Sequence, residues 1–155
     1  MKALTLWQPW ASLVAEGCKP YEFRRWAAPF SVRGQRIAIH AGARPMKRVE
    51  LLDLIELVET EGQVGTALVV EPALALLRGI LAGTVEVPRS AVVCTAVLGV
   101  PVKAVDLPPE FADSDRVDHH VWGWPLSDIR RLTPPVPARG AQGFWTWEAA
   151  DADRA

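Results

Sequence analysis

The sequence has few of the residues that hold small secreted proteins together, with only two cysteines in 155 residues. The isolated Cys18 and Cys94 form neither a disulfide framework nor a zinc site, and they fit a reducing cytoplasm. No third histidine, cysteine or carboxylate accompanies His119 and His120 at zinc-ligand spacing. We therefore expect no metal centre.

Long hydrophobic runs are missing as well. The most apolar stretch, residues 64–82, is interrupted near Glu71 and again near Arg78. It therefore lacks the roughly 18 unbroken apolar residues of a membrane span. Gln8 and Pro9 break the first apolar run too early for a signal peptide. We expect a cytoplasmic protein with no membrane partner.

The motifs of two large enzyme classes are also absent. No serine lies in a Gly-x-Ser-x-Gly motif, which excludes the usual serine hydrolase arrangement. The segment 140–143 (GAQG) is too short for a phosphate-binding loop and follows no strand–helix pattern. We expect neither a nucleoside triphosphatase nor a bound cofactor.

The composition is that of a folded domain, since 50% of the residues are hydrophobic. At 155 residues the chain lies in the usual size range of one domain. We expect a single domain over residues 1–148 and a disordered tail over residues 149–155, which are rich in alanine and aspartate.

Charge is distributed unevenly along the chain, although the net charge is only −1. Residues 1–48 carry nine basic and two acidic side chains, whereas the rest carry eight basic and sixteen acidic ones. This asymmetry indicates one positive face that meets an anionic ligand. The alternative is that the two parts interleave in space and their charges average out.

Apolar periodicity and turn residues predict the secondary structure. Helices are expected from Pro9 to Gly17, over 46–61 and from Pro72 to Gly83, with strands over 3–6, 21–26, 36–41, 90–98 and 143–148. Residues 121–132 mix strand and turn features, and the proline-rich segment 134–137 should be extended. Because the strands flank a helical pair, we predict an α+β fold whose mainly antiparallel sheet closes as a barrel.

The residues most suited to chemistry follow the first helix. On a strand, Glu22, Arg24 and Trp26 share one face, and Lys19 stands at the mouth of that strand. An ammonium and a guanidinium suit a phosphate or a polarised carbonyl. The alternative is an ordinary exposed Glu–Arg pair worth about 0–1 kcal/mol.

Aromatic residues could line such a pocket, and Gln8 and Trp10 lie shortly before Lys19 in the sequence. An unpaired base that stacks on tryptophan gains about 1–3 kcal/mol. Most tryptophans should be buried, with Trp10 and Trp26 the best candidates to face a ligand. The seven tryptophans cluster near the two chain ends, which a barrel would bring together: Trp7, Trp10, Trp26, Trp122, Trp124, Trp145 and Trp147.

His40 and Arg44 complete the candidate set. His40 alternates with Ile39, so a buried Ile39 would direct His40 toward the helices or toward a pocket. With Lys19, His40 would be the only evident acid–base pair for a ribonuclease.

These motifs resemble the ASCH (activating signal cointegrator homology) domain family. The similarity rests on Gln8-Pro9-Trp10 and on Gly17-x-Lys19-x-x-Glu22-x-Arg24-x-Trp26, and it continues through residues 37–45, 87–93 and 140–147. It implies a PUA-like β-barrel with flanking helices, a cleft beside the Gly-x-Lys segment and a role in RNA binding.

Three functions fit these observations, and the third of them is a protein-interaction role. The first is a module that binds RNA, another single-stranded nucleic acid or a nucleoside-like ligand through Gln8, Trp10, Lys19, Glu22, Arg24, Trp26, His40 and Arg44. The second is a hydrolase acting on RNA or a modified nucleoside, with Lys19 and Glu22 as catalytic groups. Some bacterial ASCH proteins are amidohydrolases of acylated cytidine that use a lysine and a threonine here. This sequence has the lysine, but Glu22 stands at the threonine position.

Overall fold

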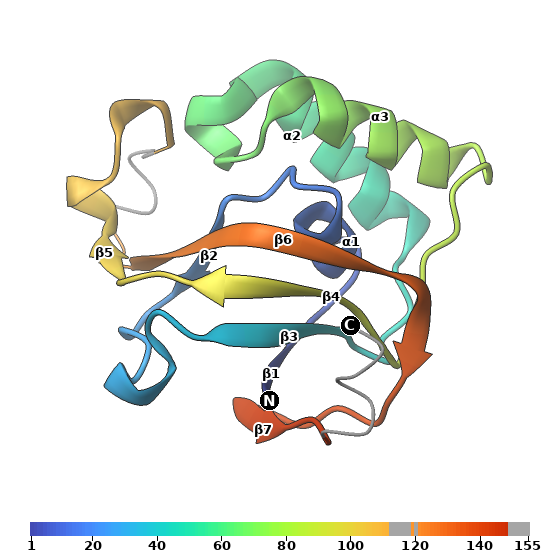
Figure 1. The fold of residues 1–155 in the computed structure, drawn as a ribbon. Helices are drawn as coiled ribbons and strands as arrows, with labels where there is room; N and C mark the ends of the chain where they lie inside the picture. The colour runs from blue at the N-terminus through green and yellow to red at the C-terminus, as the bar shows by residue number, and fades with distance from the viewer. Residues whose placement is uncertain (112–118, 120, 149–155) are drawn as a thin grey trace.

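The computed structural model describes residues 1–111, 119 and 121–148 (Figure 1). The strands are β1 (Lys2–Leu6), β2 (Tyr21–Arg24), β3 (Arg36–Ala41), β4 (Ala91–Leu98), β5 (Val102–Lys103), β6 (Trp122–Pro137) and β7 (Phe144–Thr146). The helices are α1 (Trp10–Ala15), α2 (Arg48–Thr66) and α3 (Val70–Leu81). Short 3-10 turns lie between β2 and β3 (η1, Phe30–Val32) and between β5 and β6 (η2, Ala104–Asp106, and η3, Pro109–Phe111). The tail expected over 149–155 lies outside the described residues.

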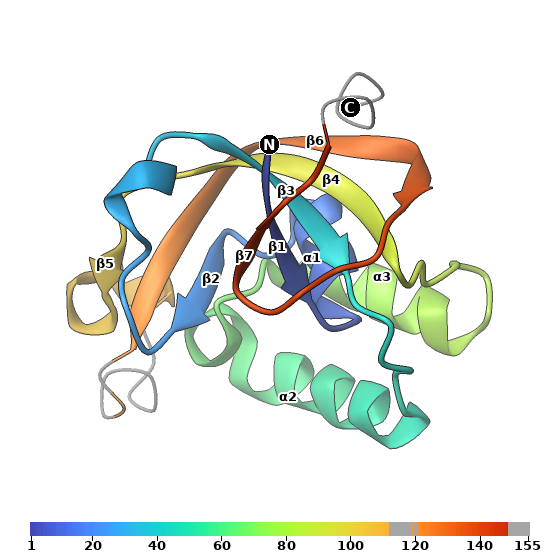
Figure 2. The same ribbon diagram turned by 90° about the horizontal axis from the view of Figure 1, so that it is seen from below.

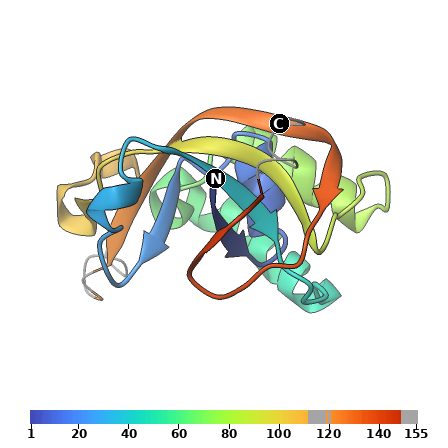
Figure 3. The ribbon, with the colours of Figure 1, turned by 60° about the horizontal axis from the view of Figure 1, so that its bottom comes forward.

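All seven strands belong to one sheet in the order β2-β6-β4-β3-β1-β7, with β5 also paired to β6. β1 and β3 run parallel, and the other pairs are antiparallel. The sheet curls into a half-barrel that arches over α1 (Figure 3). The α+β class is confirmed, but within the described part of the chain the edge strands β2 and β7 do not pair to close a full barrel.

The first and last strands meet, as the distribution of tryptophans suggested. Lys2 pairs with Thr146 and Leu4 with Phe144, while the amino group of Met1 donates to the Trp147 carbonyl at 3.0 Å. This pairing brings the segment that precedes β7 next to the end of β1 (Figure 2).

Helix α1 lies between the sheet and the α2–α3 pair (Figures 1 and 2). Ala11 and Val14 pack into the core of the half-barrel, whereas Leu13 packs with the apolar faces of α2 and α3. Gly17 ends this helix region with φ 74°, a conformation that glycine adopts at little cost, which confirms the predicted helix end. After this turn, residues 18–20 lead the chain into β2.

Two elements differ from the sequence-based expectation. The helix predicted over 46–61 breaks at Gly62 (φ 63°, ψ −158°), as expected, but a short helical stretch after this kink extends α2 to Thr66. β6 is one strand of sixteen residues that includes the proline-rich segment. Strand β6 pairs with β2, β4 and β5, and register shifts against β4 accommodate its irregular stretches. Local sequence does not reveal such long-range pairing.

Candidate functional site

A cavity of about 500 Å³ opens where the end of β1, the start of α1, β2 and residues 141–143 converge. This volume lies within the range of small-molecule binding pockets. The charged lining residues are two cations, Lys19 and Arg24, and one carboxylate, Glu22. Aromatic residues also line the cavity: Trp7, Trp10, Tyr21 and Phe23. Such a cavity can enclose a planar polar group such as a base.

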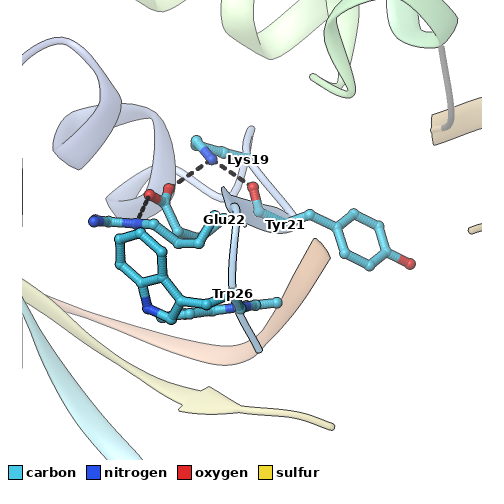
Figure 4. A network of polar contacts seen from close by, with 6 residues as sticks. Lys19, Tyr21, Glu22 and Trp26 are labelled. Atoms are coloured by element: carbon cyan, nitrogen blue, oxygen red, sulfur yellow. Dashed lines mark hydrogen bonds and ion pairs between the residues drawn. The ribbon is translucent and has the colours of Figure 1, made fainter. Parts of the chain in front are cut away.

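The charged residues form one connected network (Figure 4). The Lys19 ammonium donates to Glu22 Oε2 at 2.9 Å and to the Tyr21 carbonyl at 2.5 Å. Arg24 Nε donates to Glu22 Oε1 at 2.9 Å. Lys19 and Glu22 are each only 8% exposed, so this is a buried network instead of the exposed pair considered from the sequence.

Local structure explains why these three groups meet. The turn after Gly17 directs the Lys19 side chain back over the start of β2. Glu22 and Arg24 share a face of β2, and pairing with β6 sets Glu22 opposite Trp124. The Arg24 guanidinium lies 5.9 Å from the centroid of the buried Trp124 ring. Arg24 is thus held at its Nε, and its terminal nitrogens form no hydrogen bond with the described residues.

Aromatic rings surround the ammonium group. Lys19 Nζ lies 5.8 Å from the Trp10 centroid and 5.5 Å from the Phe23 centroid, within the range of cation–π attraction. Trp7, at the rim, is 59% exposed, and the Arg44 guanidinium covers its ring at 4.6 Å. Arg44 is itself held by a bidentate pair with Glu50, which lowers the pKa of the Glu50 carboxyl.

The structure brings together four of the eight predicted site residues. Trp10, Lys19, Glu22 and Arg24 line the cavity, and Arg44 contacts it indirectly through Trp7. Sequence analysis missed Trp7 as a wall residue, together with Tyr21, Phe23 and the 141–143 segment. The 141–143 segment could have been found from the expected pairing of the first and last strands.

Gln8 is placed in the scaffold, outside the cavity wall. Its Oε1 accepts from the Ser12 N–H at 3.0 Å, and its Nε2 donates to the Pro88 carbonyl at 2.7 Å. These bonds tie the first turn of α1 to the segment before β4. Trp26 also lies outside the lining and is 57% exposed on the surface.

The expected orientation of His40 is wrong. Ile39 is buried on the α1 side, but His40 is also buried, on the opposite face, beneath the segment that leads to β7. His40 Nε2 donates to the Ala138 carbonyl at 2.8 Å, so in the neutral ring Nδ1 accepts from the Thr5 hydroxyl at 3.2 Å. Thr5 lines the cavity, so His40 lies behind the wall and does not pair with Lys19.

Acidification should destabilise the fold through His40. Burial lowers the pKa of His40, although its bond to the Ala138 carbonyl opposes this shift. Because the unfolded chain binds this proton more readily, stability should fall as pH drops below the ordinary histidine pKa of about 6.5. Urea denaturation at pH 7.5 and 5.5 should show this loss in the wild type and a smaller loss in His40→Gln. Equal losses in the two proteins would contradict the assignment.

The predicted charge asymmetry is partly neutralised in space. Arg36 pairs with Asp128, and Arg44 pairs with Glu50 at 2.6 Å, so cations of the first 48 residues meet carboxylates of the rest of the chain. Both cysteines are buried, and burial raises the pKa of Cys94 to about 12, which keeps its thiol protonated.

In the described ranges, no helix is long and apolar enough to cross a membrane.

A curled α+β half-barrel with a polar cavity against its first helix defines a PUA-like domain. The model of the ASCH domain family matches residues 4–103. The chain belongs to the ASCH domain family, which is generally considered a nucleic-acid-binding module.

Solved structures agree with this fold. The crystal structure of ASCH from Zymomonas mobilis is similar with a TM-score of 0.54 and 14% sequence identity, over 99% of this chain and 91% of that chain. A single-substitution mutant of that protein gives a TM-score of 0.53 and 15% identity, over 99% and 92% of the two chains. At this identity the likeness shows the fold alone. A search of curated protein sequences finds no significant match.

Proposed function

We propose that this protein binds single-stranded or looped RNA by taking one unpaired base into the cavity. The observation that carries the proposal is the combination of an exposed tryptophan ring at the rim with a buried, fixed set of charged groups inside. RNA is recognised in single-stranded regions because unstacked bases can enter pockets and stack on aromatic side chains.

The rim tryptophan supports base stacking. The Arg44 guanidinium lies over the Trp7 ring, and the ring is still 59% exposed, so it remains accessible to a base. The Arg44–Glu50 pair fixes the guanidinium, so the ring loses little freedom when a ligand binds. The interior then supplies hydrogen bonds to the base edge, from the terminal nitrogens of Arg24 and to the Glu22 carboxylate.

The geometry favours binding over hydrolysis. A lysine that acts as nucleophile or general base needs a free lone pair on Nζ, but Lys19 is held as an ammonium that donates to the Tyr21 carbonyl and to Glu22 Oε2. His40, the other candidate for acid–base chemistry, lies behind the wall. Hydrolysis of RNA or of a modified nucleoside is therefore the alternative function.

Replacing Trp7 with alanine should weaken binding of a mixed-sequence single-stranded RNA by about 5- to 150-fold, because a stacked base is lost. Trp7→Phe, which keeps a stacking surface, is the matched control and should stay within a few fold of the wild type. Fluorescence anisotropy measures the affinity, and gel analysis of the same samples measures the RNA length.

The outcomes separate the candidate functions. Unchanged affinity in Trp7→Ala would place the RNA elsewhere on the protein. Shortened RNA products that disappear in Lys19→Ala would establish a hydrolase that acts on RNA.

A further inference from the structure

The segment between β2 and β3 exposes two large aromatic rings that the cavity does not use. Phe30 is 84% exposed and Trp26 is 57% exposed, and three residues separate them in the sequence. Single exposed apolar residues are ordinary on protein surfaces. Two large rings on one short segment, flanked by arginines, form a surface that suits a ligand.

The charge of this segment is of one sign. Between Glu22 and Glu50 the sequence contains seven basic residues and no acidic one. Arg25, next to Trp26, is exposed, and no ion pair with a described residue involves it. The Arg33 guanidinium lies 3.8 Å from the Phe30 centroid, while its Nε donates to the Ala28 carbonyl. A guanidinium held flat on a ring still presents N–H groups at its edge to a phosphate.

The segment continues directly from the cavity. Arg24 lines the cavity, and its guanidinium lies over the Trp124 ring, whose Nε1 donates to the Trp26 carbonyl at 3.0 Å. Arg24 and the Trp26 backbone are thus fixed on the same buried ring. Figure 4 shows Trp26 beside the network of Lys19 and Glu22.

We propose that Arg25, Trp26, Phe30 and Arg33, the β2–β3 strip, bind the nucleotides that flank the base held in the cavity. The rings of Trp26 and Phe30 stack neighbouring bases, and Arg25 and Arg33 contact the phosphates. Aromatic side chains combined with a positively charged surface are the usual means of binding a single strand without sequence preference. No ion pair with a described residue neutralises Arg25 or Arg33, so these two cations leave the strip complementary to a polyanion. This inference rests on the proposed function.

RNA length provides the test, because a dinucleotide fills the cavity while a 12-nucleotide strand also reaches the strip. We would compare the wild type with Trp26→Ala/Phe30→Ala, using both probes and anisotropy at two salt concentrations. The double variant should bind the 12-mer about tenfold or more weakly, by loss of stacking, and bind the dinucleotide as the wild type does. Arg25→Gln should lower the slope of log affinity against log salt by about 0.7 for the 12-mer.

Leu57→Ala is the matched control, since Leu57 is an exposed apolar residue of α2, away from the strip. It should bind both probes as the wild type does. If the double variant binds the 12-mer with wild-type affinity, the strip does not bind RNA, while the cavity proposal stands on Trp7→Ala. If the double variant instead changes only the oligomeric state, the strip is a protein interface and this inference is overturned. If the wild type binds neither probe, both proposals fail.

Discussion

Replacing Glu22 with glutamine is expected to lower the free energy of unfolding by about 3–5 kcal/mol, the usual cost of removing one partner from a buried ion pair. Glu22 accepts hydrogen bonds from Lys19 and Arg24 at 2.9 Å each. Glutamine keeps the shape but not the charge, so it leaves the buried Lys19 ammonium without its counter-charge. Urea denaturation followed by tryptophan fluorescence measures the change.

The control for this prediction is Glu59→Gln. Glu59 pairs with Arg78 at 3.5 Å on the surface of the helical pair, where both side chains are about half exposed. An exposed pair contributes about 0–1 kcal/mol, so this variant should remain close to the wild type. If Glu22→Gln also costs less than 1 kcal/mol, the carboxylate is not part of a buried network.

A second variant separates stability from function. Lys19→Met/Glu22→Met removes both charges, and apolar replacement of a buried pair is often neutral or stabilising. We expect this protein to recover much of the stability lost in Glu22→Gln yet to bind RNA weakly. Such a recovery would show that the buried ion pair is not needed for folding, and its place in the cavity lining supports a role in ligand binding.

The local parts of the fold could be predicted from the sequence. The alternation over residues 36–41 marks a strand that the structure reproduces at the same bounds. The glycine that ends the α1 region was recognisable because a left-handed residue is needed there. Strand β6 was recognised only in part, because prolines read as strand breakers and its pairing partners are distant in sequence.

The site was predictable where one element supplies it. Lys19, Glu22 and Arg24 lie within six residues, and strand periodicity places the last two on one face. The Trp7 wall and the 141–143 segment depend on the pairing of β1 with β7, which the sequence suggests only in outline. His40 could not be placed, because alternation fixes the two faces of a strand but not what covers each of them.

The second large effect is expected at Gly140, which lies against the buried His40. A Cβ atom at Gly140 would lie 2.5 Å from Cε1 and Nδ1 of the His40 ring and 2.7 Å from Thr5 Oγ1. The ring cannot retreat, because Nε2 is held by the Ala138 carbonyl and Trp145 packs edge-on against it. Gly140→Ala should therefore lower the free energy of unfolding by about 2–3 kcal/mol, as overpacking of a buried site does.

Gly143→Ala is the control for this prediction, because it lies in the same segment and a Cβ there meets no atom within 4 Å. Its φ of 67° makes alanine cost about 1–2 kcal/mol through the backbone alone. The steric cause is isolated by a double-mutant cycle with His40→Ala, in which Gly140→Ala should cost less than in the wild type. Additive effects in this cycle would show that the ring does not restrict Gly140. Residues 141–143 line the cavity, so Gly140→Ala should also weaken RNA binding in the protein that retains His40.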